Sequence, residues 1–504
     1  MAAGRESVIV MLRLLFPLSH RSPITQAGLF VGVLALLAIG SLAIATLPLE
    51  MIVGGAIVFI VLIATLLEPG IGLIVTLLIG PWAAWMNTYY PGLLPIDAGQ
   101  IMFALTLMAW GLGGLARREF SVPQSPLSIP LLIFTGWAAV TLLWAPDLKL
   151  GLLEVVKWIE IVLTMWFTIA LARRRGIKWI VAAVLLTMTL QAAIGIYEAR
   201  WRGIGPLGFR LSEGVYRAYG TFEQPNPFAG FIGLGLPIVL ALTAYYGISL
   251  LRRRPVVMRF RYFTRWFAGG GSALILATAL YLSFSRGAWL GAVAAIGAII
   301  ALAPRRLWIG IGLMAIAFVV LISLSNAGWL PSAINERLAD AGELLQFRDV
   351  RGAAVNDANY ALIERLARWQ AALNMLTDQP WTGVGFGNYQ AVYEQYRLIN
   401  WPTPLGHAHN IYLNVAAETG LPGLAAYVFL WAVIFGLAIQ TIRRTSGVDR
   451  ALAVGLMGAW IYLSVHNLVD NLYVNNSHLL IGVLLGLLVA LRPHAPFSRT
   501  FPDL

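Results

Sequence analysis

Long apolar segments follow one another along almost the whole chain, and short polar or basic turns separate them. A helix needs about 20 predominantly apolar residues to cross the hydrocarbon core of a bilayer. The expected fold class is therefore all-α, a polytopic membrane protein with about 12–14 transmembrane helices and a large outer loop that contains amphipathic helices. The pattern places fourteen such helices at 27–46, 51–67, 71–87, 98–115, 128–145, 151–172, 177–197, 228–250, 267–284, 287–303, 307–327, 419–441, 451–469 and 477–491.

Basic residues between these segments orient the chain. Clusters such as Arg117-Arg118, Arg173–Arg175 and Arg443-Arg444 all fall on one side if fourteen spans are counted. Lys and Arg are enriched in cytoplasmic loops, so this side is expected to be the cytoplasm, with both termini there and an uncleaved anchor at the start.

The topology divides the chain into alternating membrane and loop regions. The expected regions are a cytoplasmic N-terminus (1–26), N-terminal transmembrane helices (27–197), an outer loop with Arg217 (198–227), central transmembrane helices with Arg286 at an outer turn (228–327), a large outer loop (328–408), C-terminal transmembrane helices (409–491) and a cytoplasmic tail (492–504).

Composition agrees with a membrane protein and excludes several other classes. Of the 504 residues, 59% are hydrophobic and 12% are charged, whereas a soluble domain carries roughly a quarter charged residues. The net charge of +12 follows from the cytoplasmic arginines and attracts anionic lipid, so nucleic acid is not an expected partner. The chain has no Cys, which excludes a disulfide, a thiolate nucleophile and a Cys-ligated metal.

The outer loop at 328–408 is the most polar part of the chain and carries a net negative charge. Leu362, Leu366, Trp369 and Leu373 recur at helical spacing, with Glu364, Arg365 and Arg368 between them, which predicts an amphipathic helix on the outer face or over a cavity. The glycines of 383–387 lack the Lys-Ser/Thr of a nucleotide loop and predict a tight turn.

Two of the six histidines, His407 and His409, stand where this loop re-enters the membrane. An imidazole at this boundary is a candidate general base because its pKa lies near neutrality. A His-x-His pair could also bind a metal, but neighbouring carboxylates show no ligand spacing, so no metal is expected. Asn410 could begin a helix.

Two outer arginines stand apart from the cytoplasmic clusters. Arg286 lies in a turn between two apolar helices, and Arg217 lies in the loop before Asn226. Snorkelling to the surface could explain Arg286, and an ordinary solvated charge could explain Arg217. Guanidinium groups bind phosphate through paired hydrogen bonds, so two arginines near one histidine would suit a pyrophosphate leaving group beside a base.

Other polar residues lie within the predicted spans. Glu154, Lys157 and Glu160 can pair along one helix face, which favours a structural role. His466 and Asp470 are expected one helical turn apart at the outer end of their span, as a supporting or acceptor-site pair.

These residues resemble the O-antigen ligase and polymerase superfamily of bacterial membrane glycosyltransferases. The strongest match is His409-Asn410, followed after nine residues by Gly420-Leu-Pro-Gly423. Weaker matches are Arg217-Ala-Tyr-Gly with Pro225-Asn226, Ser285-Arg286-Gly287, and the stretch from Trp369 to Tyr389. The resemblance covers about 200–425; the first 200 residues match only as membrane spans.

The resemblance implies an inverting transfer of a glycan from an undecaprenyl-pyrophosphate carrier to an acceptor hydroxyl, without metal, nucleotide or other cofactor. It places the active site on the outer face of the bacterial inner membrane. His409 would be the base and Arg217 and Arg286 would bind the pyrophosphate, with His407, Asn226 and Asn410 as further substrate-binding positions. The acceptor could be a lipid A core, the growing glycan or a protein hydroxyl.

The sequence departs from the family in two ways and leaves two rival functions open. Fourteen predicted spans exceed the dozen or so that are usual in the family. His407 is a second imidazole beside His409, so the assignment of His409 as the base rests on motif spacing alone. A polysaccharide transporter or flippase would instead use charges within the membrane, such as Glu154, Lys157 and Glu160. The second rival is a non-catalytic membrane scaffold, in which the positions of the outer arginines and of the histidine would have no catalytic meaning.

Overall fold

The computed structural model describes residues 48–92, 96–118, 121–252, 255–329, 349–356 and 359–492. Most of these residues are helical. Their only strands are β1 (Arg210–Ser212) and β2 (Val215–Tyr216), which pair antiparallel as a short hairpin. The expected all-α fold class is confirmed, while the span at 27–46 and both chain ends lie outside the described residues.

The chain forms two compact units, residues 1–68 and 69–504. The first unit contributes α3 (Leu49–Leu67), which is apolar apart from Glu50 and Thr65.

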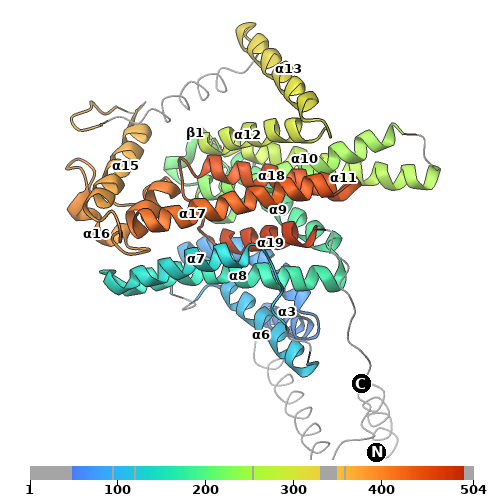
Figure 1. The fold of residues 1–504 in the computed structure, drawn as a ribbon, viewed down its shortest axis with the longest axis horizontal. Coiled ribbons are helices and arrows are strands. Elements are labelled where there is room, and N and C mark those ends of the chain that lie inside the picture. Colours follow the sequence, from blue (N-terminus) through green and yellow to red (C-terminus); the bar gives the residue numbers. More distant parts are fainter. Residues whose placement is uncertain are drawn as a thin grey trace, which may run out of the picture. The chain divides into compact units, whose positions relative to one another are not determined.

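The second unit contains all the remaining described elements. They are α4 (Pro69–Ile79), η1 (Gly80–Trp82), α5 (Ala83–Tyr89), α6 (Ala98–Ala116), α7 (Ser128–Val140), η2 (Thr141–Trp144), α8 (Leu148–Arg175), α9 (Lys178–Arg200), η3 (Leu207–Phe209), η4 (Gly220–Phe222), α10 (Pro225–Leu250), α11 (Val256–Leu282), α12 (Arg286–Leu302), α13 (Leu307–Asn326), α15 (Tyr360–Asp378), α16 (Tyr389–Tyr396), α17 (Ile411–Arg444), α18 (Gly447–His466) and α19 (Ser477–Ala490). The helices α15 and α16 lie together beside the first part of α17 (Figure 1).

Each predicted span that falls on described residues contains a helix. Nine helical segments in this part of the chain are long and apolar enough to cross a membrane, and three shorter apolar helices accompany them, Ser128–Trp144, Arg286–Leu302 and Ser477–Ala490. The predicted span 267–284 corresponds to α11, which is in neither group. The Ser285-Arg286 turn does separate two helices, α11 and α12, as expected.

The helix boundary of one span differs from the prediction. The sequence places its start at 419, whereas α17 begins at Ile411 and is kinked at Gly420, where φ is 68° and ψ is −175°. A Cβ at Gly420 would lie 2.6 Å from the carbonyl carbon of Trp381, so the kink requires glycine both for its backbone angle and for its space. The apolar pattern detects only the part of α17 beyond the kink, because the preceding turns carry Asn414, Glu418 and Thr419.

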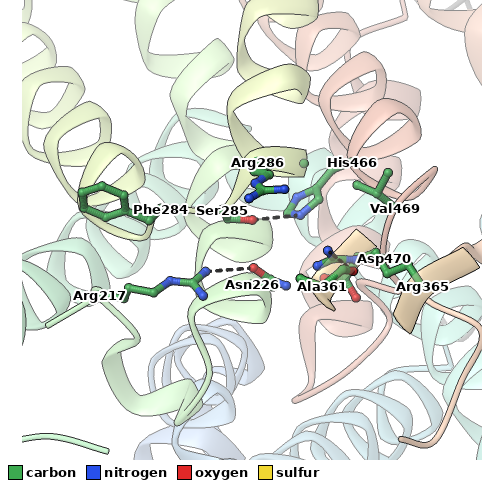
Figure 2. A pocket seen from close by; sticks show the side chains of 11 residues that line it. Arg217, Asn226, Phe284, Ser285, Arg286, Ala361, Arg365, His466, Val469 and Asp470 are labelled. Carbon is green, nitrogen blue, oxygen red and sulfur yellow. Dashed lines mark hydrogen bonds between the residues drawn. The ribbon is translucent and has the colours of Figure 1, made fainter. Parts of the chain in front are cut away.

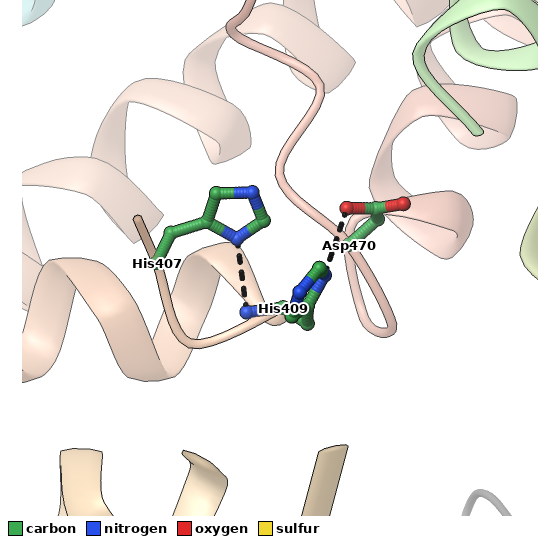
Figure 3. A group of neighbouring side chains, drawn as sticks. All are labelled: His407, His409 and Asp470. Carbon is green, nitrogen blue, oxygen red and sulfur yellow. Dashed lines mark hydrogen bonds and ion pairs between the residues drawn. The ribbon is translucent and has the colours of Figure 1, made fainter. Parts of the chain in front are cut away.

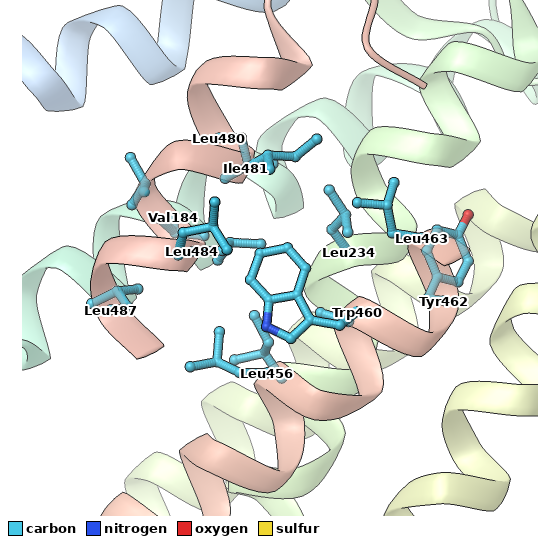
Figure 4. Packing of buried hydrophobic residues seen from close by; sticks show 14 of the residues in the cluster. Val184, Leu234, Leu456, Trp460, Tyr462, Leu463, Leu480, Ile481, Leu484 and Leu487 are labelled. Carbon is cyan, nitrogen blue, oxygen red and sulfur yellow. The ribbon is translucent and has the colours of Figure 1, made fainter. Parts of the chain in front are cut away.

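Tight packing around Trp460 fixes the position of α18. The indole is fully buried and lies between Leu234 of α10, Val184 of α9 and Leu484 of α19 (Figure 4). Close van der Waals packing of this kind is a main source of helix association in a membrane, where lipid competes for every apolar contact. Helix α18 ends at His466, so the residues that follow it lie at one end of the bundle.

The predicted amphipathic helix is α15, and it covers that same end. Its residues Leu362, Leu366 and Trp369 are buried in a small cluster with Val469, which lies just beyond α18. The glycine-rich segment 383–387 is the expected tight turn, with positive φ at Gly383, Gly385 and Gly387. It lies against α17, since the Val384 amide donates to the Ala417 carbonyl at 2.9 Å.

Candidate active site

A polar cavity of about 100 Å³ lies where α10, α12, α15 and α18 meet (Figure 2). We call it the arginine pocket. Three guanidinium groups line it, those of Arg217, Arg286 and Arg365. The other polar residues of the wall are Asn226, Ser285, His466 and Asp470. The two arginines that the sequence singles out therefore share one cavity with Asn226.

Arg217 is held rigidly at the edge of the pocket. Its Nε donates to the Ser283 carbonyl at 2.8 Å, and its Nη2 donates to Oδ1 of Asn226 at 3.3 Å. The Ala218 amide donates to the Leu282 carbonyl at 2.8 Å, which ties this loop to the end of α11. Asn226 thus orients the arginine from the first turn of α10, whose N-terminus adds partial positive charge.

Arg286 opens helix α12, so its side chain and the helix N-terminus lie together at the pocket. The turn before it is tight, with a positive φ of 50° at Phe284. Gly287 also lines the pocket, and a Cβ there would meet Val469 at 2.5 Å and His466 at 2.6 Å. Glycine therefore allows α12 to approach the end of α18 closely. A helix N-terminus with a guanidinium beside it is a favourable environment for an anion.

Arg365 is the pocket residue that the sequence argument missed. It lies three residues after Leu362 and four before Trp369, so it shares the apolar face of α15 with them. The sequence signal that could have identified Arg365 was its charge on the otherwise apolar face of this helix. Burial lowers the pKa of Arg365, while the charge of Asp470 raises it, and an arginine keeps its proton in either case.

His409 lies next to the pocket through its bond with Asp470 (Figure 3). Nδ1 of His409 and Oδ1 of Asp470 are 3.3 Å apart. Burial raises the pKa of Asp470, but the hydrogen bond from His409 and the attraction of nearby imidazoles outweigh it and hold the pKa below its ordinary value. An ionised carboxylate only accepts, so the Nδ1–H of His409 donates to it, and in the neutral imidazole Nε2 then carries the lone pair.

The backbone around His409 is strained and firmly held. Its φ of 54° is uncommon for a residue other than glycine. The Trp369 indole donates to its carbonyl at 3.4 Å, and the Ile411 amide donates to the Asn467 carbonyl at 3.0 Å. Strain held by surrounding contacts is typical of positioned functional residues.

His407 stands beside His409 but has a different environment. The ring centroids are 4.4 Å apart, and Nδ1 of His407 accepts the backbone N–H of His409 at 3.1 Å. Desolvation, together with the charge of His409, lowers the pKa of His407 to about 3. A neutral imidazole that accepts at Nδ1 supports the loop conformation, and such a weakly basic ring is poorly suited to take a proton at neutral pH.

The structure places the Asp470 carboxylate beside His407 and His409. The spacing of these residues in the sequence did not suggest this contact. His407, His409 and Asp470 offer ligand atoms within 4.8 Å of one another. A zinc ion at about 2.1 Å from each ligand needs ligand atoms roughly 3.4 Å apart, and Nδ1 of His409 and Oδ1 of Asp470 are 3.3 Å apart. The expectation of a metal-free site stays a prediction.

His466 and Asp470 are not one turn apart on a helix, as the sequence argument expected. Helix α18 ends at His466, and Asp470 lies in the loop that follows. The two nitrogens of His466 face the Tyr462 hydroxyl at 3.2 Å and the Ser285 hydroxyl at 3.5 Å. Both residues line the arginine pocket, but only Asp470 contacts the candidate base.

The other polar residues of the sequence argument have structural partners. Asn410 caps α17, since its Oδ1 accepts the Leu413 amide at 3.1 Å. The Lys157 ammonium pairs with Glu154, as expected along one helix face. Glu160 instead pairs with His478 of α19 at 2.6 Å, a long-range contact that helix spacing could not show.

Comparison with known proteins gives one family. Residues 271–428 match the family model described as O-antigen ligase. This region is similar to the O-antigen ligase superfamily. It runs from α11 to α17 and contains Arg286, Arg365 and His409, whereas Arg217, Asn226 and Asp470 lie outside it and reach the site through the fold. The comparison with curated proteins gives no match.

The apolar helices describe a multi-pass membrane protein, and the match over residues 271–428 supports an activity of the lipid-linked glycan ligase or polymerase type. The family implies a lipid-linked glycan donor and a glycan acceptor.

Proposed function

We propose that this protein transfers a glycan from an undecaprenyl-pyrophosphate carrier to an acceptor hydroxyl at the outer face of a bacterial inner membrane. The main support is that the arginine pocket and His409 are joined by one residue, Asp470, which lines the pocket and binds the imidazole. A site for a pyrophosphate and a base for the acceptor are therefore neighbours.

In the proposed reaction, His409 acts as general base through Nε2. The acceptor oxygen attacks the anomeric carbon of the donor sugar on the face opposite the phosphate. The bond from this carbon to the phosphate oxygen breaks, its electron pair stays with the departing lipid pyrophosphate, and the acceptor proton passes to His409. A single displacement of this kind inverts the anomeric centre. A positioned general base contributes about 10²–10⁴ in rate.

The three arginines would stabilise the leaving group in this mechanism. Negative charge grows on the pyrophosphate as the bond breaks, and guanidinium groups held in position beside it stabilise that charge without rearranging. Arg286 begins helix α12 and Arg217 lies in the loop after β2, whereas Arg365 comes from α15. The donor carries its own leaving group, so the proposed step needs neither nucleotide nor metal.

Reconstitution with an undecaprenyl-pyrophosphate glycan tests this proposal. We expect transfer by the unaltered chain and a loss of about 10²-fold or more for His409→Ala, with donor binding retained because the arginine pocket is intact. Full transfer by His409→Ala would contradict the assigned base. Product on a growing ladder, on a lipid A core or on a protein would identify the acceptor, and donor translocation without transfer would favour the transporter.

A further inference from the structure

A second, much larger cavity lies between α9, α10, α11 and α18. Its volume is about 670 Å³, and most of its wall is apolar, with side chains such as Val181, Leu185, Leu242 and Ile275. We call it the apolar groove. Small residues of α11 open one side, and at Gly271 an added Cβ would meet no atom within 4 Å.

The apolar groove and the arginine pocket lie toward opposite ends of the same helices. The charged residues of the groove are Lys178, at the start of α9, Arg265, in the first half of α11, and Asp449, near the start of α18. The other end of α18 carries His466, and the turn after α11 carries Arg286, both in the arginine pocket. If these helices cross the membrane, the two cavities serve opposite leaflets.

The depth of the apolar groove matches one leaflet. Along α9 it extends from Lys178 to Thr189, which is about 16 Å at the helical rise of 1.5 Å per residue. Half of a hydrocarbon core of about 30 Å is nearly the same length. Near the inner end of the groove, the Thr189 hydroxyl bonds to that of Ser272 at 2.6 Å and joins α9 to α11.

The charges at the groove mouth fit a phosphodiester. Lys178 and Arg265 are cationic and Asp449 is anionic, which leaves a formal charge of +1 among the groove residues. The Arg265 guanidinium is held over the Tyr246 ring, 5.6 Å from its centroid. A phospholipid carries one negative phosphodiester directly above its acyl chains, so a single molecule would place charge at the mouth and hydrocarbon along the apolar wall.

We propose that the apolar groove binds one acyl chain of a phospholipid, with the lipid phosphate between Lys178 and Arg265. The lipid comes from the leaflet opposite the arginine pocket. The polyprenyl donor does not fit this site, because its pyrophosphate belongs at the other end of the helices and its chain is far longer than one leaflet. The site is therefore separate from glycan transfer.

Native mass spectrometry of the full, purified chain tests the site after delipidation and titration with palmitoyl-oleoyl phosphatidylglycerol or phosphatidylethanolamine. We expect one molecule of either lipid to bind tightly. Basic residues near a membrane surface each weaken binding about fivefold when removed, so Lys178→Gln with Arg265→Gln should lower affinity about 25-fold. Gly271→Leu should fill the groove and lower affinity for both lipids without touching the charges.

Two matched controls distinguish this site from general lipid contact. Gly436→Leu adds the same side chain on α17, where a Cβ also meets nothing within 4 Å, and Arg259→Gln removes an exposed charge of α11 outside the groove. Both should bind lipid as the unaltered chain does. Unchanged binding by Gly271→Leu, or displacement of the phospholipid by equimolar undecaprenyl phosphate, would overturn the proposal. A failure of glycan transfer would leave these binding results unaffected.

Discussion

Asp470 accepts a hydrogen bond from His409 across 61 residues of sequence, with 3.3 Å between Oδ1 and Nδ1. The same carboxylate lines the arginine pocket, so one residue connects the candidate base to the candidate leaving-group site. The Asn471 amide also donates to Oδ1 of Asp470 at 2.8 Å, which fixes the direction of the carboxylate.

Asp470→Asn should lower the transfer rate about 10²-fold, because an amide neither fixes the Nδ1–H tautomer of His409 nor stabilises the imidazolium. The measurement is initial rate with saturating donor. Asp378→Asn is the matched control, since Asp378 is exposed and bonds only to Tyr396 among the described residues. Its rate should be unchanged.

The pH dependence of stability gives a second measurement of Asp470. Its pKa is lowered in the folded chain, so its ionised form stabilises the fold above the unfolded pKa of about 3.9. Any thermal-stability advantage of the unaltered chain over Asp470→Asn that arises from this ionisation should therefore be present at pH 6 and shrink as the pH falls below about 4. An advantage that grows on acidification would contradict the lowered pKa.

His407 should act by positioning rather than as a base. Its pKa of about 3 means that it does not titrate between pH 5 and 8, so His407→Asn should leave the acid limb of the rate profile in place. Asn can still accept the His409 backbone N–H, whereas His407→Ala cannot, so we expect a larger rate loss for Ala than for Asn. Equal, near-complete loss in both variants would return the base role to His407.

Arg365 should bind the donor although it belongs to the outer helix α15. We expect Arg365→Gln to lower kcat/KM for the donor about 10²-fold, since a positioned donor that stabilises developing charge is worth this much. Arg365→Lys should recover only part of the loss, because a single ammonium cannot form the paired bonds of a guanidinium. Arg351→Gln, on an exposed residue paired with Asp349, should behave as the unaltered chain.

Removal of metal ions should not change transfer. Three arginines supply the positive charge that the proposed step needs, so the step does not call for a metal ion. Dialysis against EDTA followed by a rate measurement checks this. A loss of activity that added zinc restores would instead assign His407, His409 and Asp470 to a metal.

Gly420→Ala should destabilise the site without touching a functional side chain. The substitution puts a Cβ 2.6 Å from the Trp381 carbonyl carbon and forces a positive φ on alanine, which costs about 1–3 kcal/mol in unfolding free energy. Gly436→Ala lies on the same helix with open space around it and should be neutral or slightly stabilising. Thermal unfolding of both variants in detergent gives the comparison.

The sequence could predict most of the helical architecture because long apolar runs are a local signal. It also predicted α15, since Leu362, Leu366 and Trp369 repeat at the helical period. The true start of α17 at Ile411 escaped this reasoning, because its first turns contain polar residues that are buried against the 383–387 segment and the outer helices.

The candidate site was predictable only in part, because some of its contacts join segments that are far apart in the sequence. Their place outside the cytoplasmic clusters singled out Arg217 and Arg286, and motif spacing singled out His409, but nothing local to Asp470 indicates that it binds His409. The sequence by itself determined a helical membrane protein, the main helices and the residue types available for chemistry. Tertiary packing decided which of them meet: α15 packs on Val469 and carries Arg365 over the pocket, and the loop after α18 turns Asp470 toward His409. Such contacts join distant segments through shape and burial, which no periodic pattern along the chain records.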